Sequence, residues 1–230
     1  MRKLLDGNVL IIGDTHIPYE RKDYLEFCKE IQNRVRCKTV IHIGDLCDNH
    51  SISYHEHDPD AMSPADEMKE ADKHLVAWFK AFPIVKLCAA NHDLVDRKGK
   101  TAGLPKRCFK MFPEIWNLPK SWDYQKEYSI NSVTYTHGSG YSGETGHLKA
   151  AYRERNSTVI GHIHSAAGCG YTANNKDCIF GMNVGCGIDR DANVFDYTLM
   201  HTRKPVIGCG VVTDYGRFAQ FFPMSLGRKK

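Results

Sequence analysis

Short runs of apolar, β-branched residues alternate with amphipathic stretches in the first half of the chain. Residues 8–14 and 39–45 are rich in Val and Ile, and each run ends in Gly-Asp. Runs of this length and composition are typical of strands that are covered on both faces. Between them, apolar residues recur at helical spacing from Tyr24 to Val35. The pattern therefore predicts a strand–helix–strand unit with parallel strands, which need a long crossover.

A second helix is predicted to begin after Ser63. Ser63 suits the N-cap, Pro64 suits the first helical position, and an acidic residue stands three positions after the cap. Pro83 ends the helix, and residues 84–88 predict a third buried strand. The apolar face of this helix would consist of Met68, Ala71, Leu75, Trp78, Phe79 and Phe82.

The second half of the chain is richer in strands. Residues 128–130 and 133–135 flank Asn131-Ser132, a pair that is typical of a hairpin turn. The overall pattern predicts an α/β fold whose strand-rich second half closes on the first, without internal repeats. The other elements predicted here are a helix over 144–155 and strands over 158–161, 178–184, 205–213 and 218–222.

Composition narrows the class of protein. The 230 residues are 42% apolar and 25% charged, which supports a packed core rather than disorder. This length fits one domain, residues 1–230. No apolar run approaches the roughly 20 residues of a membrane span, and the run Val9–Ile12 is shorter than the apolar region of a signal peptide. We therefore expect a cytoplasmic chain without a membrane partner.

The cysteines point to no special chemistry. All nine are widely spaced, and none forms a CxxC pair. This spacing supports neither a zinc ribbon nor a disulfide framework. We expect free thiols, including Cys47, which we interpret as a packed residue rather than a metal ligand.

Residue types that bind metals gather where the predicted strands end. Because ligand sites in open α/β sheets lie at the carboxyl ends of strands, we expect these segments to converge. Their oxygen and imidazole donors suit divalent Mn, Fe, Zn or Ni, and two such ions can bind both the attacking and the leaving oxygen at phosphorus. The pattern therefore indicates a two-metal hydrolase. The segments are Asp14-Thr15-His16, Asp45-Leu46-Cys47-Asp48, Asn91-His92-Asp93, Thr136-His137-Gly138 and Gly161-His162-Ile163-His164.

Taken together and in this order, the five segments resemble the calcineurin-like metallophosphoesterase superfamily. The likeness spans residues 13–164, and the whole chain is most similar to small stand-alone phosphoesterases of the kind that bacteriophages encode. The resemblance implies a four-layer α/β/β/α sandwich of two mixed β-sheets flanked by helices. It also implies hydrolysis of a phosphoester by a hydroxide held between two divalent ions, with Mn²⁺ expected first and Fe, Zn or Ni as alternatives. For a phage-encoded chain the compartment would be the host cytoplasm.

The resemblance assigns a role to each matching position. Asp45 would bridge the two ions. His92 would protonate the leaving oxygen or donate a hydrogen bond to the phosphate, and Asp48 would orient its imidazole from behind. The remaining six ligands fall into one set for each ion: Asp14, His16 and His164 for the first, and Asn91, His137 and His162 for the second.

Two positions depart from the family pattern. Ala90 stands where the family usually has Gly, so a left-handed backbone there would be strained. Asn49 follows Asp48, whereas protein Ser/Thr phosphatases of the superfamily carry there an Arg that grips a phosphomonoester. The missing Arg and the net charge of +4 favour a phosphodiester substrate, with DNA or RNA as one version. A broad phosphomonoesterase and a metal-bound interaction scaffold with little turnover remain the alternatives.

Three further residues are candidate substrate contacts. His50 and Tyr54 lie in residues 49–60, which form either a loop over the metal site or a polar surface loop. Arg97 begins a stretch to Lys110 that holds six basic residues and no acidic one. This stretch would either steer a polyanion toward the site or form a solvated basic loop. The oligomeric state is left open by the sequence.

Overall fold

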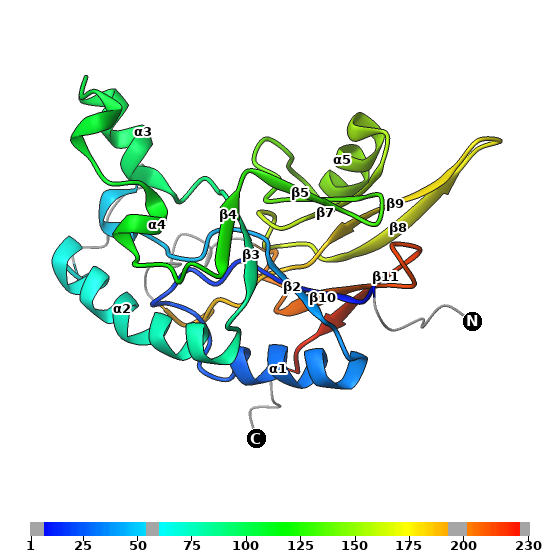
Figure 1. The fold of residues 1–230 in the computed structure, drawn as a ribbon, viewed down its shortest axis with the longest axis horizontal. Coiled ribbons are helices and arrows are strands. Elements are labelled where there is room, and N and C mark those ends of the chain that lie inside the picture. Colours follow the sequence, from blue (N-terminus) through cyan, green and yellow to red (C-terminus); the bar gives the residue numbers. More distant parts are fainter. Residues whose placement is uncertain (1–6, 54–59, 193–201, 226–230) are drawn as a thin grey trace.

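A computed structural model describes residues 7–53, 60–192 and 202–225 of the chain (Figure 1). In these residues two mixed β-sheets pack face to face, and helices cover their outer faces. The predicted α/β sandwich of two mixed sheets flanked by helices is therefore confirmed. None of the helices in these ranges is long and apolar enough to cross a membrane.

The first sheet has the strand order β11-β10-β1-β2-β3-β4. β1, β2, β3 and β4 pair in parallel, whereas β10 pairs antiparallel with both β1 and β11. Ile12 lies beside His42, and His42 lies beside Leu87, so the carboxyl ends of these three strands are aligned. The strands are β1 (Val9–Ile12), β2 (Thr39–His42), β3 (Val85–Cys88), β4 (Trp122–Gln125), β10 (Gly208–Thr213) and β11 (Phe218–Pro223).

The second sheet has the strand order β5-β6-β7-β9-β8. β6, β7 and β9 pair in parallel, and β5 and β8 are antiparallel to their neighbours. The predicted hairpin between β5 and β6 is confirmed, with Asn131 and Ser132 at φ 54° and 59°, as a tight hairpin turn requires. The strands are β5 (Glu127–Ile130), β6 (Val133–Thr136), β7 (Ser157–Ile160), β8 (Gly168–Ala173) and β9 (Cys178–Asn183).

Helices α1 and α2 cover the first sheet, and α5 covers the second through contacts with β7 and β9. The segment between β3 and β4 contains α3, which projects away from the two sheets (Figure 1), and α4, where Phe112 and Trp116 pack into the core of the first sheet. The helices are α1 (Tyr24–Val35), α2 (Pro64–Ala81), α3 (Leu94–Thr101), α4 (Phe112–Ile115) and α5 (Gly146–Glu154), with short 3₁₀ turns at His50–Ile52 and Lys106–Cys108.

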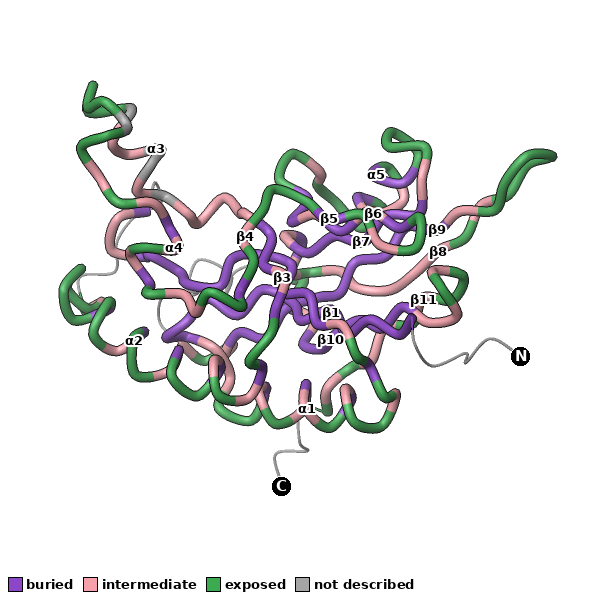
Figure 2. Tube along the Cα trace, viewed as in Figure 1, coloured by how far each residue is buried: buried purple, intermediate pink, exposed green. Residues whose placement is uncertain are grey.

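The central strands of the first sheet, β1 and β2 among them, are buried on both faces, as their composition predicts. Leu10 and Ile12 pack into the core beneath α1 and α2, while Val9 and Ile11 pack into the core between the two sheets. Figure 2 shows the same contrast, with buried strands at the centre and exposed outer turns of the helices. This rigid double layer holds the ends of the strands, where the polar segments begin.

Helix α2 begins as predicted but presents a different face to the core. The Ser63 hydroxyl accepts a hydrogen bond from the N–H of Asp66, which confirms the N-cap. The predicted burial of Met68 is wrong, since its side chain is 40% exposed. Glu67 is buried instead, because its carboxylate accepts hydrogen bonds from the N–H groups of His50 and Ser51. The loop after β2 is thereby anchored to α2.

Candidate metal centre and cleft

The ends of five strands bring all seven predicted ligands together. In two groups of side chains, every donor atom lies within 4.8 Å of the others, and Asp45 belongs to both groups. Asn91 joins the second group, because its Oδ1 lies 2.7 Å from Nε2 of His137. The sharing of Asp45 is the arrangement expected of a carboxylate that bridges two ions. The first group is Asp14, His16, Asp45 and His164, and the second is Asp45, His137 and His162.

Left-handed turns after the strands direct several of these side chains inward. The φ angle is 51° at His16, 45° at Asp45 and 66° at His162. Such conformations cost about 1–3 kcal/mol each in non-glycine residues, so surrounding contacts must hold them. The strain anticipated at Ala90 is not found, since Ala90 is not among the described residues with positive φ. Its Cβ lies where a side chain on Gly44 would collide, at 2.8 Å.

Two buried carboxylates, those of Asp14 and Asp45, carry the negative charge among the proposed ligands. Oδ2 of Asp14 accepts a hydrogen bond from the N–H of His162 at 2.7 Å, and Oδ1 of Asp45 accepts one from the N–H of His92 at 3.0 Å. Within the described structure, the buried Oδ1 of Asp14 and Nδ1 of His137 have no hydrogen-bond partner. Burial opposes ionisation of Asp45, but His137 and His92 outweigh it and hold its pKa well below the ordinary value. Buried oxygen and imidazole atoms with unused bonding capacity fit divalent ions of the Mn, Fe, Zn or Ni type.

Protonation of His137 would make metal binding at this site depend on pH. Burial alone would lower the pKa of this imidazole, but the carboxylates of Asp45 and Asp14 raise it to about 9. The metal-free site therefore holds a proton at neutral pH, and a metal ion has to displace it. We expect the affinity of the metal-stripped protein for Mn²⁺ to rise about tenfold per pH unit up to about 9, with release of one proton.

Isothermal titration calorimetry in buffers of different ionisation enthalpy measures both the affinity and the released proton. An affinity that is constant from pH 6.5 to pH 8.5, with no proton released, would contradict the placement of His137 among the ligands.

His92 lies between the ligand cluster and the cleft. Its Nδ1 donates to the main-chain carbonyl oxygen of Asp48 at 2.5 Å, and because a carbonyl only accepts, this nitrogen carries a proton. The imidazole is 19% exposed and lines the cleft. Nε2 is thus the nitrogen of His92 that remains for exchange with a substrate.

Asp48 contacts two histidines, His16 most closely through its carboxylate and His92 most closely through its main-chain carbonyl oxygen. Its carboxylate lies 2.5 Å from Nδ1 of His16 and 3.3 Å from Nδ1 of His92. The side chain therefore contacts the proposed ligand His16 more closely, whereas the main-chain carbonyl makes the closer contact with His92. Asn49, beside it, donates from its side-chain amide to the carbonyl oxygen of His92 at 2.8 Å. Asn49 thus fixes the His92 loop.

The proposed substrate contacts fare differently in the structure. His50 is buried, and its Nδ1 lies 3.8 Å from Oδ2 of Asp48 behind the ligands, outside the lining of the cleft. Tyr54 falls outside the described residues. Arg97 lies in α3, and only its backbone is described. Cys47 is a buried free thiol whose pKa is raised by burial, and it belongs to neither ligand group.

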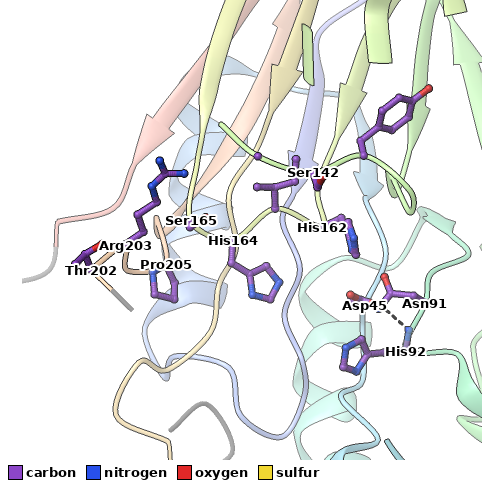
Figure 3. A pocket seen from close by; sticks show the side chains of 13 residues that line it. Asp45, Asn91, His92, Ser142, His162, His164, Ser165, Thr202, Arg203 and Pro205 are labelled. Carbon is purple, nitrogen blue, oxygen red and sulfur yellow. Dashed lines mark hydrogen bonds between the residues drawn. The ribbon is translucent and has the colours of Figure 1, made fainter. Parts of the chain in front are cut away.

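A cleft of about 630 Å³ opens over the ligand cluster (Figure 3). One wall contains Tyr141 and Ser142, and another contains Thr202 and Arg203; sequence reasoning identified none of these four. The sequence does contain a sign of the first wall. Glycines at 138, 140 and 143, all with positive φ, mark a tight loop after β6. A lone Arg before β10 carries no such signal. The cleft is lined by Asp45, Asn91, His92, Tyr141, Ser142, Gly143, His162, Ile163, His164, Ser165, Thr202, Arg203 and Pro205.

The fold and sequence of this chain were compared with those of known proteins. Among solved structures, Vps29 from Cryptosporidium parvum has 14% identity and a TM-score of 0.47, covering 90% of this chain and 84% of that chain. Yfce, a phosphoesterase from E. coli, has 12% identity and a TM-score of 0.42, with coverage of 89% and 87%. Pseudomonas putida nuclease MPE has 14% identity and a TM-score of 0.37, with coverage of 96% and 93%. No curated protein sequence matches the chain significantly. The calcineurin-like phosphoesterase family model matches residues 7–186, and the chain therefore belongs to that family.

Proposed function

We propose that this chain is a phosphoesterase that needs two divalent metal ions and prefers phosphodiesters. The position of His92 carries this proposal. Its imidazole faces the cleft beside two groups of metal-binding side chains, and its other nitrogen is fixed by the carbonyl oxygen of Asp48. A scaffold that only binds metal would not need a proton donor at this place.

Two divalent ions bound here would neutralise charge on the phosphoryl group and lower the pKa of water. Mn²⁺ is the metal that we expect first, with Fe, Zn or Ni as alternatives that the same donors accept. The ligands would be Asp14, His16, Asp45, Asn91, His137, His162 and His164.

His92 would act on the leaving group. Because Nδ1 keeps its proton on the Asp48 carbonyl, the proton transferred to the leaving oxygen comes from Nε2. Burial disfavours the imidazolium, but the carboxylates of Asp45 and Asp48 outweigh it and raise the pKa of His92 in the metal-free protein. Asp48 and Asn49 hold the ring and its main chain, so they are positioning residues in this proposal.

The preference for diesters rests on the missing cation beside the ligands. Asn49 is buried and bonded to the main chain of His92, so it offers no charge to a phosphate. A phosphomonoester carries a second negative charge that such a cation would neutralise, whereas a diester does not. DNA and RNA are therefore the leading substrate candidates, together with smaller nucleotide diesters.

A comparison of two chromogenic substrates tests the preference. With purified protein and Mn²⁺, we expect bis-p-nitrophenyl phosphate to be hydrolysed at least about tenfold more efficiently than p-nitrophenyl phosphate, because one favourable charge contact is worth about this factor. The measured quantity is kcat/KM for each substrate. A preference for the monoester would identify a phosphatase and overturn the diester proposal.

A further inference from the structure

We propose that Arg203 binds a second anionic group of the substrate, next to the phosphate that is cleaved. The substrate would then be a nucleotide diester with at least two phosphates, such as a nucleic-acid strand. This inference rests on the proposed phosphodiesterase function and specifies its substrate class.

Charge singles out Arg203. It is the one Lys or Arg side chain among the described residues that line the cleft. The other polar lining residues close to it are neutral hydroxyls, Ser165 and Thr202. A guanidinium presents several N–H groups in a fixed plane and can bind a phosphate through two parallel hydrogen bonds. This end of the cleft therefore suits an anion.

The position of Arg203 favours a second anionic group of the ligand over the phosphate that is cleaved. Arg203 and Thr202 lie at one end of the cleft, and Asn91 and His92 lie at the other, with His164 between them (Figure 3). A phosphate beside Asp45, Asn91 and His92 would lie at the far end. The cleft, at about 630 Å³, is far larger than one phosphate requires and lies in the range of nucleotide-sized ligands. An additional anionic group of the same ligand would reach Arg203.

In the absence of such a ligand, Glu144 occupies the guanidinium of Arg203. The guanidinium lies 2.9 Å from Oε1 of Glu144, with side chains 57% and 64% exposed. This pair connects the loop after β6 to the loop before β10, the two loops that line the cleft opposite His92. Exposed ion pairs contribute little free energy, so a phosphate can replace the Glu144 carboxylate at little cost.

The proposal predicts opposite effects for the two partners of this ion pair. Arg203→Ala removes the cation and should weaken binding of the second phosphate. Glu144→Gln removes the competing carboxylate and should strengthen it. If the pair served only to clasp the two loops, both substitutions would shift binding in the same direction, because either one breaks the clasp.

Binding of short thymidine oligonucleotides in the presence of Mn²⁺ measures these effects. The probes are TpT, which has one internal phosphate, and pTpT and TpTp, which add a terminal phosphate on either side. The proteins carry His92→Asn, which slows hydrolysis of the probes during the measurement, and Kd is measured by calorimetry. We expect pTpT or TpTp to bind about tenfold more tightly than TpT, a difference that Arg203→Ala abolishes and Glu144→Gln increases.

Arg217→Ala provides a matched control. Arg217 is also exposed and paired with an acidic residue, Asp214, but it lies in the turn between β10 and β11. This variant should leave all three Kd values unchanged. Equal affinity for the three probes, or parallel shifts in Arg203→Ala and Glu144→Gln, would overturn the inference. A failure of the proposed function shows separately, as absent hydrolysis of bis-p-nitrophenyl phosphate by the protein with His92 intact.

Discussion

Asp45→Ala is expected to remove metal binding and hydrolysis together. Asp45 is the one residue that both groups of donor atoms share, with Oδ2 at 3.1 Å from Nε2 of His137 and 3.6 Å from Nε2 of His16. Its Oδ1 also accepts a hydrogen bond from the main-chain N–H of His92, so the substitution releases the loop that carries the proposed proton donor. We expect hydrolysis to fall by more than about 10³-fold, since metal ions supply several kcal/mol of transition-state stabilisation.

Metal content measured by mass spectrometry should fall from two ions per chain to one or none in Asp45→Ala. Asp123→Ala, which removes an exposed carboxylate on β4, is the matched control and should change neither metal content nor rate. Circular dichroism would show that both variants are folded. Full metal occupancy in Asp45→Ala would refute the assignment of Asp45 as the bridging ligand.

His92→Asn is expected to lower kcat by about 10²–10⁴-fold while both metal ions stay bound. The substitution removes the Nε2 proton donor but none of the seven proposed ligands. The size of the loss should depend on the leaving group. p-Nitrophenolate leaves readily without a proton, whereas the alkoxide of a nucleotide needs one, so the larger loss belongs to a dinucleotide substrate.

The measurement is kcat for bis-p-nitrophenyl phosphate and for TpT, with metal content determined on the same samples. His74→Asn serves as the control, because His74 is a half-buried histidine on α2 that pairs with Glu20 away from the cleft. Equal losses for the two substrates would indicate that His92 binds the phosphate rather than the leaving group. An unchanged rate would remove His92 from the mechanism.

Much of the first sheet could be predicted from the sequence, because its central strands are buried on both faces. Val9–Ile12 is a continuous apolar run, and residues 39–45 repeat the pattern. Such runs are typical of strands buried on both faces, so the apolar pattern alone identifies both strands. Helix α2 carries its own start signal in Ser63 and Pro64. The five polar segments were recognisable because each follows a strand directly, and the carboxyl ends of strands from both sheets meet at the site.

Two strands escaped prediction because their pairing depends on distant residues. β4 has only Trp122 fully buried among polar neighbours, and it exists because it pairs with β3. β8 contains two glycines and little apolar surface, and it is held by β9 along its whole length. Neither strand has the apolar alternation that marks a strand in isolation.

The walls of the cleft lay beyond sequence reasoning for a similar reason. The proposed role of Arg203 depends on its ion pair with Glu144, nearly sixty positions earlier, and on its place in the cleft opposite His92. The burial of Glu67 could not be predicted from the helix alone, because its carboxylate is buried only where it accepts hydrogen bonds from the loop after β2. Contacts between segments far apart in the chain determine both residues, and local patterns do not contain them.

A metal titration of the stripped protein tests the two-metal phosphodiesterase most directly. Mn²⁺ is added to chelator-treated protein while the hydrolysis of bis-p-nitrophenyl phosphate and the bound metal are recorded together. We expect no hydrolysis without metal and a rate that rises until two ions are bound per chain. Hydrolysis without metal, or two bound ions without any hydrolysis, would contradict it.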